Sequence, residues 1–198
     1  MCGRFESKRV EETLLDLFNY NKLQVKVDSE INNRADEDIR PTQKIVGVLK
    51  QDKGYRVAKV NWGIKFSDDS PLIFNSRIET IKEKKFWNTL FSNNKCIVPM
   101  TGFYEWKTEG KKKIKYKITV PELKIFFVPA LYHKDKEKNL CASLITTTPN
   151  SFIKQIHHRM PVILDFNEAL KFLTDTTEEN LQKCIPLPDS KKMEMELS

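Results

Sequence analysis

Short apolar runs separated by turn signals constrain the fold of this chain more than any other feature. Runs at residues 45–49 and 55–60 flank the turn signal Asp52-Lys53-Gly54, which predicts a β-hairpin that leads to Trp62. Residues 114–120 alternate apolar side chains with Lys and Thr, as in a strand that exposes one face to water. The other predicted strands cover residues 96–100, 125–131 and 140–145.

Helical signals lie on both sides of these runs. Apolar residues at helical spacing follow Ser7, a candidate N-cap, and the pairs Asp165/Glu168 and Thr176/Glu179 have the spacing of capping boxes. The predicted helices cover residues 8–19, 80–91, 152–156, 166–173 and a short segment after Thr176. Residues 20–42 are polar and predict a long surface loop, and residues 186–198 predict a loose tail.

Composition and length predict one soluble domain over residues 1–198. The chain is 39% hydrophobic and 31% charged, and no stretch approaches the roughly 18 to 20 apolar residues of a membrane span. The start lacks the layout of a secretory signal, so we expect a cytoplasmic protein without a membrane partner. The net charge of +7 makes a polyanion a plausible partner, although the run Lys111-Lys112-Lys113 is more typical of a solvated hairpin.

The four cysteines are too far apart for a metal site or a redox pair. No C-x-x-C spacing is present, and the histidines do not cluster with the cysteines, so no metal and no cofactor is expected. Cys96 and Cys141 lie within apolar runs, which favours packing in the core as free thiols. Cys2 is the cysteine for which the sequence suggests a chemical role.

The start of the chain, Met1-Cys2-Gly3-Arg4-Phe5, suggests a reactive terminus. Aminopeptidases remove Met1 before a small residue, and a free Cys2 would carry a thiol of pKa about 8.5 beside an amine of pKa about 8. A 1,2-aminothiol reacts preferentially with aldehydes: the amine forms an imine and the thiol closes a thiazolidine ring. The alternative is an incidental cysteine on a frayed terminus.

Two further stretches carry polar groups with catalytic potential. On an extended chain Asn75, Arg77 and Glu79 would share one face. Glu105 lies between Tyr104 and Trp106, and flanking aromatics would exclude water and raise the pKa of its carboxyl group. The alternative is a strand residue that points to solvent.

Four motifs together resemble the SRAP family, the SOS-response-associated peptidases or abasic-site processing proteins. The resemblance covers about residues 1–175. The motifs are Met1-Cys2-Gly3-Arg4-Phe5, Asn75-Ser76-Arg77 with Glu79-Thr80, Cys96-Ile97-Val98-Pro99 with Gly102-Phe103-Tyr104-Glu105-Trp106, and His157-His158-Arg159-Met160-Pro161. The resemblance implies an α+β domain with a curved, barrel-like, mostly antiparallel sheet and flanking helices. It also implies a monomer that binds single-stranded DNA and reacts with abasic sites in the response to DNA damage, near the nucleoid in a bacterium.

The family's chemical roles fall on four residues of this chain. Cys2 is the expected nucleophile, Asn75 the amide near the amine and the sugar, and Glu105 and His157 the proton-transfer groups, whose acid and base roles stay open. The family motif His-x-Arg-Met-Pro selects His157 over His158, and strand-like geometry would turn their two rings to opposite faces.

Four residues are expected to contact DNA. Arg4, Arg77 and Arg159 would bind phosphates, and Trp62 would lie near unstacked bases. An internal ion pair with Glu79 or Asp165 is the alternative for Arg77 and Arg159. The chain departs from the family pattern at Lys65, where a proline is frequent, and at Asn94-Lys95, where a basic pair is frequent.

Three functions remain open from the sequence. The first is a covalent, thiazolidine-type crosslink between Cys2 and abasic DNA, with associated lyase chemistry. The second is a cysteine peptidase in which His157 is the base, whose activity could be limited to release of Met1. The third is a non-covalent module for single-stranded DNA in which Cys2 is incidental.

Overall fold

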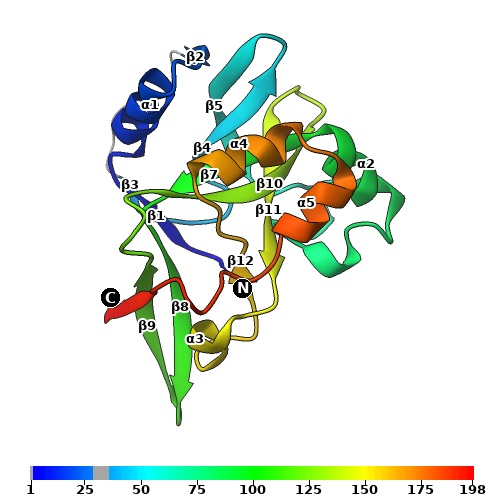
Figure 1. Ribbon diagram of the computed structural model, residues 1–198. Helices are drawn as coiled ribbons and strands as arrows, with labels where there is room; N and C mark the ends of the chain where they lie inside the picture. The colour runs from blue at the N-terminus through cyan, green and yellow to red at the C-terminus, as the bar shows by residue number, and fades with distance from the viewer. Residues whose placement is uncertain (1, 29–35) are drawn as a thin grey trace.

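Five strands of this computed structural model, which describes residues 2–28 and 36–198, close into a barrel (Figure 1). They are β4 (Lys44–Gln51), β5 (Gly54–Trp62), β7 (Lys95–Met100), β10 (Phe126–Lys134) and β11 (Leu140–Thr147). Neighbours pair antiparallel in the order β11-β10-β7-β4-β5, and β11 closes the ring by pairing with β5 in parallel. The predicted hairpin and the predicted barrel-like α+β fold are confirmed.

Short strands extend the barrel at β5 and β11. β2 (Val25–Val27) pairs with β5, β6 (Asn75–Arg77) runs parallel to β11, and β12 (Met160–Pro161) runs antiparallel to β11. Thr146 of β11 is in register with both Arg77 and Pro161. Strand β11 therefore brings the Asn-Ser-Arg motif and the end of the His motif to the same place.

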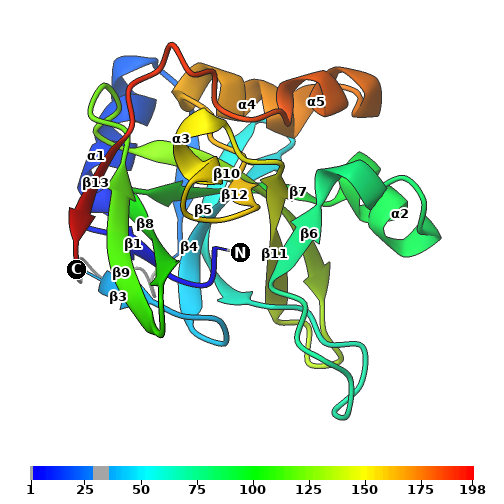
Figure 2. The ribbon, with the colours of Figure 1, turned by 90° about the horizontal axis from the view of Figure 1, so that it is seen from below.

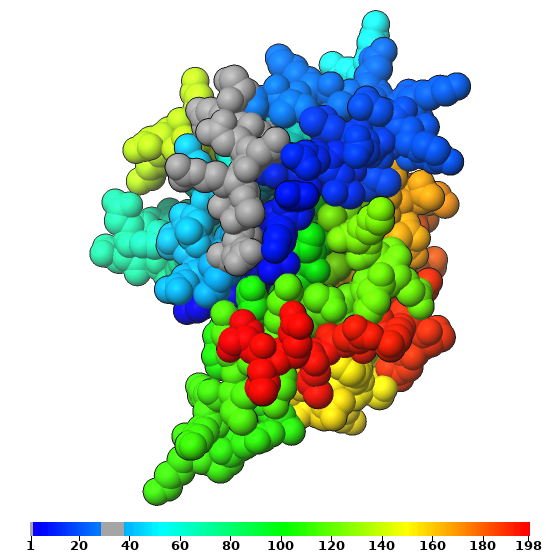
Figure 3. All heavy atoms as spheres, turned by 90° about the vertical axis from the view of Figure 1, so that its left-hand side faces the viewer, coloured from blue at the N-terminus to red at the C-terminus, as the bar shows by residue number. Residues whose placement is uncertain are grey.

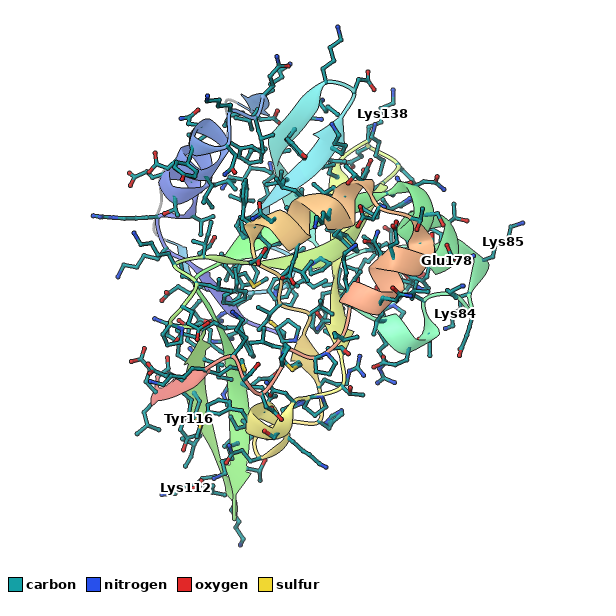
Figure 4. The ribbon with its side chains drawn as sticks, viewed as in Figure 1. Lys84, Lys85, Lys112, Tyr116, Lys138 and Glu178 are labelled. Atoms are coloured by element: carbon teal, nitrogen blue, oxygen red, sulfur yellow. The ribbon has the colours of Figure 1, made fainter. Side chains whose placement is uncertain are left out.

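A second sheet lies against the barrel and carries the N-terminus. Its strands run in the order β13 (Glu194–Leu197), β9 (Lys112–Thr119), β8 (Gly102–Glu109), β1 (Phe5–Ser7) and β3 (Asp36–Ile39). The hairpin of β8 and β9 projects beyond the rest of the molecule (Figure 3), with Lys112 near its tip (Figure 4). Because β1 pairs with the first residues of β8, the Cys2 end of the chain lies beside the strand that carries Glu105.

Helices α1 (Val10–Tyr20), α2 (Lys85–Asn93) and α4 (Phe166–Thr174) cover the outer surface of the barrel. Helix α5 (Thr177–Lys183) contacts α4, the short helix α3 (Ser151–Lys154) buries Ile153, and a 3₁₀ turn, η1 (Ile78–Thr80), follows β6. Both predicted capping boxes are present, at Asp165 and at Thr176, and α4 and α5 lie side by side (Figure 2). Within the described residues, no helix combines the length and the apolar character needed to cross a membrane.

Alternating residues of the barrel strands build two hydrophobic cores. Val46, Val48 and Val57 face the outer core beneath α1, α2 and α4. Ile45 and Val60 face the inner core. Side chains on both faces of each strand are therefore buried away from water. This explains why the sequences of these strands are continuous apolar runs.

Three local predictions are wrong. Ser7 belongs to β1 and does not cap α1, which begins after Arg9 in a left-handed conformation. The expected loop at residues 20–42 contains β2 and β3, and its residues 29–35 lie outside the described residues. The expected loose tail at 186–198 is ordered because Leu187 and Met193 are buried and β13 pairs with β9 (Figure 3).

Candidate active site

Cys2 is held in the inner core rather than on a frayed end. Its side chain is 0% exposed, and its thiol donates to the Arg4 carbonyl oxygen at 3.8 Å. The Asn75 side-chain amide donates to the Cys2 carbonyl oxygen at 2.9 Å. Met1 lies outside the described residues, so its removal stays a prediction.

Asn75 is positioned by the barrel. Asn75 lies on β6 and is in register with Leu144, in the middle of β11. One end of its amide binds the Cys2 backbone, while its buried Oδ1 has no hydrogen-bond partner among the described residues. An orphaned buried acceptor is costly unless a ligand or water satisfies it. The side chain can therefore fix Cys2 and accept a hydrogen bond from a reacting group.

The thiol of Cys2 is kept protonated by its surroundings. Burial raises its pKa well above the usual range, and the nearby Glu105 carboxylate raises it further. A thiolate at this position would be both desolvated and repelled. The site therefore holds a neutral thiol that must lose its proton during bond formation.

Glu105 is buried on β8, with 2% of its surface exposed. Burial raises the pKa of its carboxyl group, in agreement with the prediction made from the flanking aromatics and against the solvent-facing alternative. Glu105 and His157 line the same cleft of about 640 Å³, which we call the Glu105 cleft. Its other lining residues are Trp106, Thr108, Lys113, Lys154, Ile156 and His158.

His157 follows α3 and enters the site as a neutral ring. Its Nδ1 accepts a hydrogen bond from the Arg159 backbone N–H at 3.0 Å, so the neutral imidazole carries its proton on Nε2. Burial lowers the pKa of His157 to about 4. The prediction that the two neighbouring rings face opposite sides is wrong: His157 and His158 stack with centroids 4.3 Å apart, because this stretch is a turn and not a strand.

Arg159 forms the internal ion pair that the sequence left open. It is 7% exposed and makes two hydrogen bonds to the Glu79 carboxylate, at 2.7 and 2.9 Å. A third bond, at 2.7 Å, reaches the Thr146 carbonyl oxygen of β11. Glu79 lies on η1, so it does not extend the strand face of Asn75 and Arg77 as predicted. Arg159 therefore connects η1 to β11 through these hydrogen bonds, and its guanidinium is not exposed for a contact to DNA.

Arg77 is an exposed cation two residues from Asn75. It lies on β6, and no hydrogen bond or ion pair of its side chain occurs among the described residues. Arg4 is partly buried, with its guanidinium 2.8 Å from Asp38 Oδ2 and above the Trp106 ring at 5.4 Å. Both cations remain candidates for phosphate contacts.

Trp62 occupies a different place from the one predicted. Its side chain is 0% exposed, packs on Phe5 with ring centroids 5.0 Å apart, and donates through Nε1 to the Phe74 carbonyl oxygen at 2.9 Å. A fully buried indole offers no face to a base, so Trp62 contributes to the core. Gly63 follows it with φ 126, and a Cβ there would lie 2.5 Å from the Leu72 side chain.

Sequence reasoning missed several residues that surround the site. Lys113 and Lys154 line the Glu105 cleft, and Asp38 and Lys115 lie beside Arg4. The sequence places Lys113 in a charged hairpin and Asp38 in a polar segment that predicts a loop. No local pattern distinguishes these residues from other surface charges, because Asp38 and Lys115 come beside Arg4 only through the pairing of β1 with β3 and β8 and of β8 with β9.

A family model and several known proteins match this chain over most of its length. A model of the family described as SOS response associated peptidase (SRAP) matches residues 1–197. The Bacillus subtilis abasic site processing protein YoaM is 30% identical over 98% of this chain and 89% of its own length. The Escherichia coli abasic site processing protein YedK is 25% identical over 94% of this chain and 88% of its own length.

Solved structures share the architecture. A protein of Bacteroides thetaiotaomicron superposes with a TM-score of 0.76 at 26% identity, covering 100% of this chain and 89% of its own. A protein of Bordetella bronchiseptica superposes with a TM-score of 0.79 at 15% identity, covering 100% of this chain and 99% of its own. At this level of identity the similarity shows a shared fold only.

Proposed function

The chain belongs to the SOS response associated peptidase family, and we propose that it crosslinks covalently to abasic sites in single-stranded DNA through its N-terminal cysteine. The observation that carries the proposal is the position of Cys2, which is anchored by Asn75 and close enough to Glu105 for that carboxylate to raise its pKa. The names of the relatives, abasic site processing proteins, support the same substrate.

The proposed reaction uses both functional groups of Cys2. After Met1 is removed, the free amine adds to the C1′ aldehyde of the ring-opened deoxyribose and gives a carbinolamine. Loss of one water gives an imine. The Cys2 sulfur then bonds to C1′, and the thiol proton passes to the nitrogen as the thiazolidine closes. Overall, one aldehyde and one aminothiol give one thiazolidine and one water.

Glu105 is the better proton carrier of the two candidate groups. Its raised pKa makes a protonated carboxyl group available closer to neutral pH, so it can protonate the departing hydroxyl and later relay the thiol proton to the nitrogen. His157 has a pKa of about 4 and is neutral at pH 7, with its proton on Nε2 because Nδ1 accepts from the Arg159 backbone N–H. We assign it as a neutral hydrogen-bond donor to the sugar oxygens.

The state of the thiol weighs against a general cysteine peptidase. Such an enzyme needs a thiolate whose pKa is lowered by a neighbouring cation, whereas burial and Glu105 raise the pKa of Cys2. Release of Met1 alone remains within the proposal, because it precedes the crosslink. Intact masses of Cys2→Ala and Glu105→Gln proteins made without host aminopeptidase test whether that release is autocatalytic.

Contacts to the DNA backbone are proposed for Arg77 and Arg4. Arg77 is exposed two residues from Asn75, and Arg4 is two residues from Cys2, so phosphates on either side of the abasic sugar could bind them. Arg159 and Trp62 are left out of this set because both are buried.

Incubation with an abasic single-stranded oligonucleotide tests the proposal. Wild-type protein is expected to give an adduct that survives a denaturing gel, and Cys2→Ala to give none. Cys2→Ser keeps the amine but cannot close the sulfur ring, so it should form an adduct only after borohydride reduction. Cys96→Ala changes a buried thiol in the same core and should leave the adduct intact. An adduct with Cys2→Ala, or salt-dependent binding without any adduct, would support the non-covalent alternative instead.

A further inference from the structure

Four charged side chains converge beside the Cys2 end of the chain. One oxygen of Asp38, Oδ2, lies 2.8 Å from Arg4, 3.3 Å from Lys115 and 3.7 Å from Arg40. We call Arg4, Asp38, Arg40 and Lys115 the Asp38 cluster. Three cations face one carboxylate, so the cluster keeps a net charge of +2 (3 − 1). Such a cluster has unused capacity for an anion.

Aromatic rings lie against two of the three cations of the cluster. The Arg4 guanidinium lies above the Trp106 ring at 5.4 Å, and the Lys115 ammonium lies above the Tyr104 ring at 3.9 Å. Both rings belong to β8, which also carries Glu105. Aromatic faces hold cations in place, so these positive charges stay beside the site whether or not Asp38 remains between them.

Asp38 has one oxygen without a partner. Its Oδ1 is buried without a hydrogen-bond partner among the described residues, and its φ of 65 lies in the left-handed region, which Asp and Asn tolerate better than most residues. An unsatisfied buried oxygen disfavours the observed arrangement. The contacts through Oδ2 therefore hold Asp38 in a position that its second oxygen does not favour.

We propose that the Asp38 cluster is a subsite for a phosphate of the DNA backbone and that Asp38 occupies it as an internal competitor. The inference rests on the proposed function, because Arg4 is two residues from Cys2, so that phosphates of a strand whose abasic sugar reaches Cys2 would come near it. A phosphate presents anionic oxygens to Arg4, Arg40 and Lys115 as Asp38 does, and the two anions cannot share the site. DNA binding then requires Asp38 to leave Arg4.

The opposing interpretation is that Asp38 orients Arg4 for DNA. Both interpretations use the same ion pair but predict opposite effects of removing the charge. If Asp38 competes, its loss strengthens DNA binding. If Asp38 orients Arg4, its loss frees the guanidinium to move and weakens binding.

The test measures the affinity of Asp38→Asn for an intact single-stranded oligonucleotide by fluorescence anisotropy at low and at physiological salt. Asparagine tolerates the left-handed backbone, so the substitution removes charge with little change of shape. We expect roughly five-fold tighter binding at low salt and a smaller gain at higher salt. Asp38→Gly removes the same charge and fits the same backbone, and should give a gain of the same sign if Asp38→Asn folds poorly.

Asp28→Asn is the matched control. It makes the same change of charge and also breaks an arginine pair, since Asp28 holds Arg56 through two hydrogen bonds. It should leave DNA affinity within about two-fold, as expected for a charge away from the strand. Equal gains from both substitutions would mean a general effect of net charge, and unchanged or weaker binding by Asp38→Asn would overturn the proposal.

A second comparison probes the cluster directly. Lys115→Gln should weaken binding more in the Asp38→Asn background than in the wild type, because Asp38 no longer neutralises the lysine. Additive effects would contradict a shared phosphate subsite. Adduct formation with abasic DNA is measured separately on each protein: loss of the adduct with retained tightening rejects the crosslinking function alone, and an intact adduct without tightening rejects the subsite alone.

Discussion

At the scale of single residues, burial shifts the pKa values of Glu105 and His157, the two proposed proton-transfer groups, in opposite directions. Burial raises the pKa of Glu105, which favours its neutral acid, and lowers the pKa of His157, which favours its neutral base. Burial therefore disfavours the charged form of both residues. The chemistry of an uncharged aldehyde and a neutral thiol suits such an environment, because the charges that arise are transient and can be passed between these groups.

The raised pKa of Glu105 predicts a dependence of stability on pH. Because the folded state binds the proton more tightly than the unfolded state, the stability that Glu105 contributes is present below its ordinary pKa of 4.5 and lost as the pH rises through the folded value. Wild-type protein should therefore lose stability relative to Glu105→Gln between pH 4 and pH 8, as thermal unfolding at several pH values would show. Glu83→Gln, at an exposed position, is the control. A difference between wild type and Glu105→Gln that does not change with pH would contradict the assignment.

At the scale of elements, the C-terminal segment holds the helix that precedes His157. Asn150 caps α3 by accepting from the Ile153 N–H at 3.0 Å, and its amide donates to the Leu187 carbonyl oxygen at 3.1 Å. The His157 N–H in turn donates to the Ile153 carbonyl oxygen at 2.8 Å. The position of the His157 ring is thus linked to Leu187 in the C-terminal segment.

Asn150→Ala should expose this dependence. Loss of the cap and of the bond to Leu187 is expected to lower the free energy of unfolding by about 2 kcal/mol. The turn that carries His157 loosens at the same time, so adduct formation should also slow. Urea unfolding and the crosslinking rate measure the two effects. Asn93→Ala removes an exposed amide that bonds only within α2 and should change stability by less than about 0.5 kcal/mol.

The elements that could be predicted are those with local signals. The hairpin of β4 and β5 and both capping boxes follow from residues within a few positions of one another. Closure of the barrel could not be derived in this way, since it pairs Asn61 with Cys141, which are 80 residues apart. The prediction of a barrel-like sheet comes from the family resemblance. Local patterns alone predict the strands but not their order in the sheet.

The same limit applies to the site. The motifs identified Cys2 and Glu105 as candidates, and the structure brings them close together. The burial of Trp62 in the core and the pairing of Arg159 with Glu79 could not be predicted from the sequence, because both depend on contacts with other parts of the chain. The ordered tail was missed because only Leu187 and Met193 are buried in an otherwise polar segment.

At the scale of the whole molecule, the net charge of +7 is spread over the surface. Figure 4 shows Lys112 near the tip of the β8–β9 hairpin, Lys138 at the opposite end, and Lys84 and Lys85 on a third side. Charge alone therefore does not trace the path of a strand. The Glu105 cleft, with Lys113 and Lys154 on its walls, identifies the cations that a DNA strand at the site would meet.

Salt dependence separates cleft lysines from the others. If Lys113 contacts a phosphate of single-stranded DNA, Lys113→Gln should make the slope of log affinity against log salt shallower by about 0.7. Lys138→Gln makes the same change beside a different pocket and should leave the slope unaltered. Equal slopes for the two variants would place the strand away from the cleft.

The central claim is a covalent bond at Cys2, and an intact-mass spectrum of the protein after reaction with an abasic oligonucleotide tests it most directly. We expect one species with the mass of the chain without Met1, plus the oligonucleotide, minus one water, and a DNA-bearing peptide that begins at Cys2. An unmodified chain, or an adduct on a peptide that lacks Cys2, would contradict it.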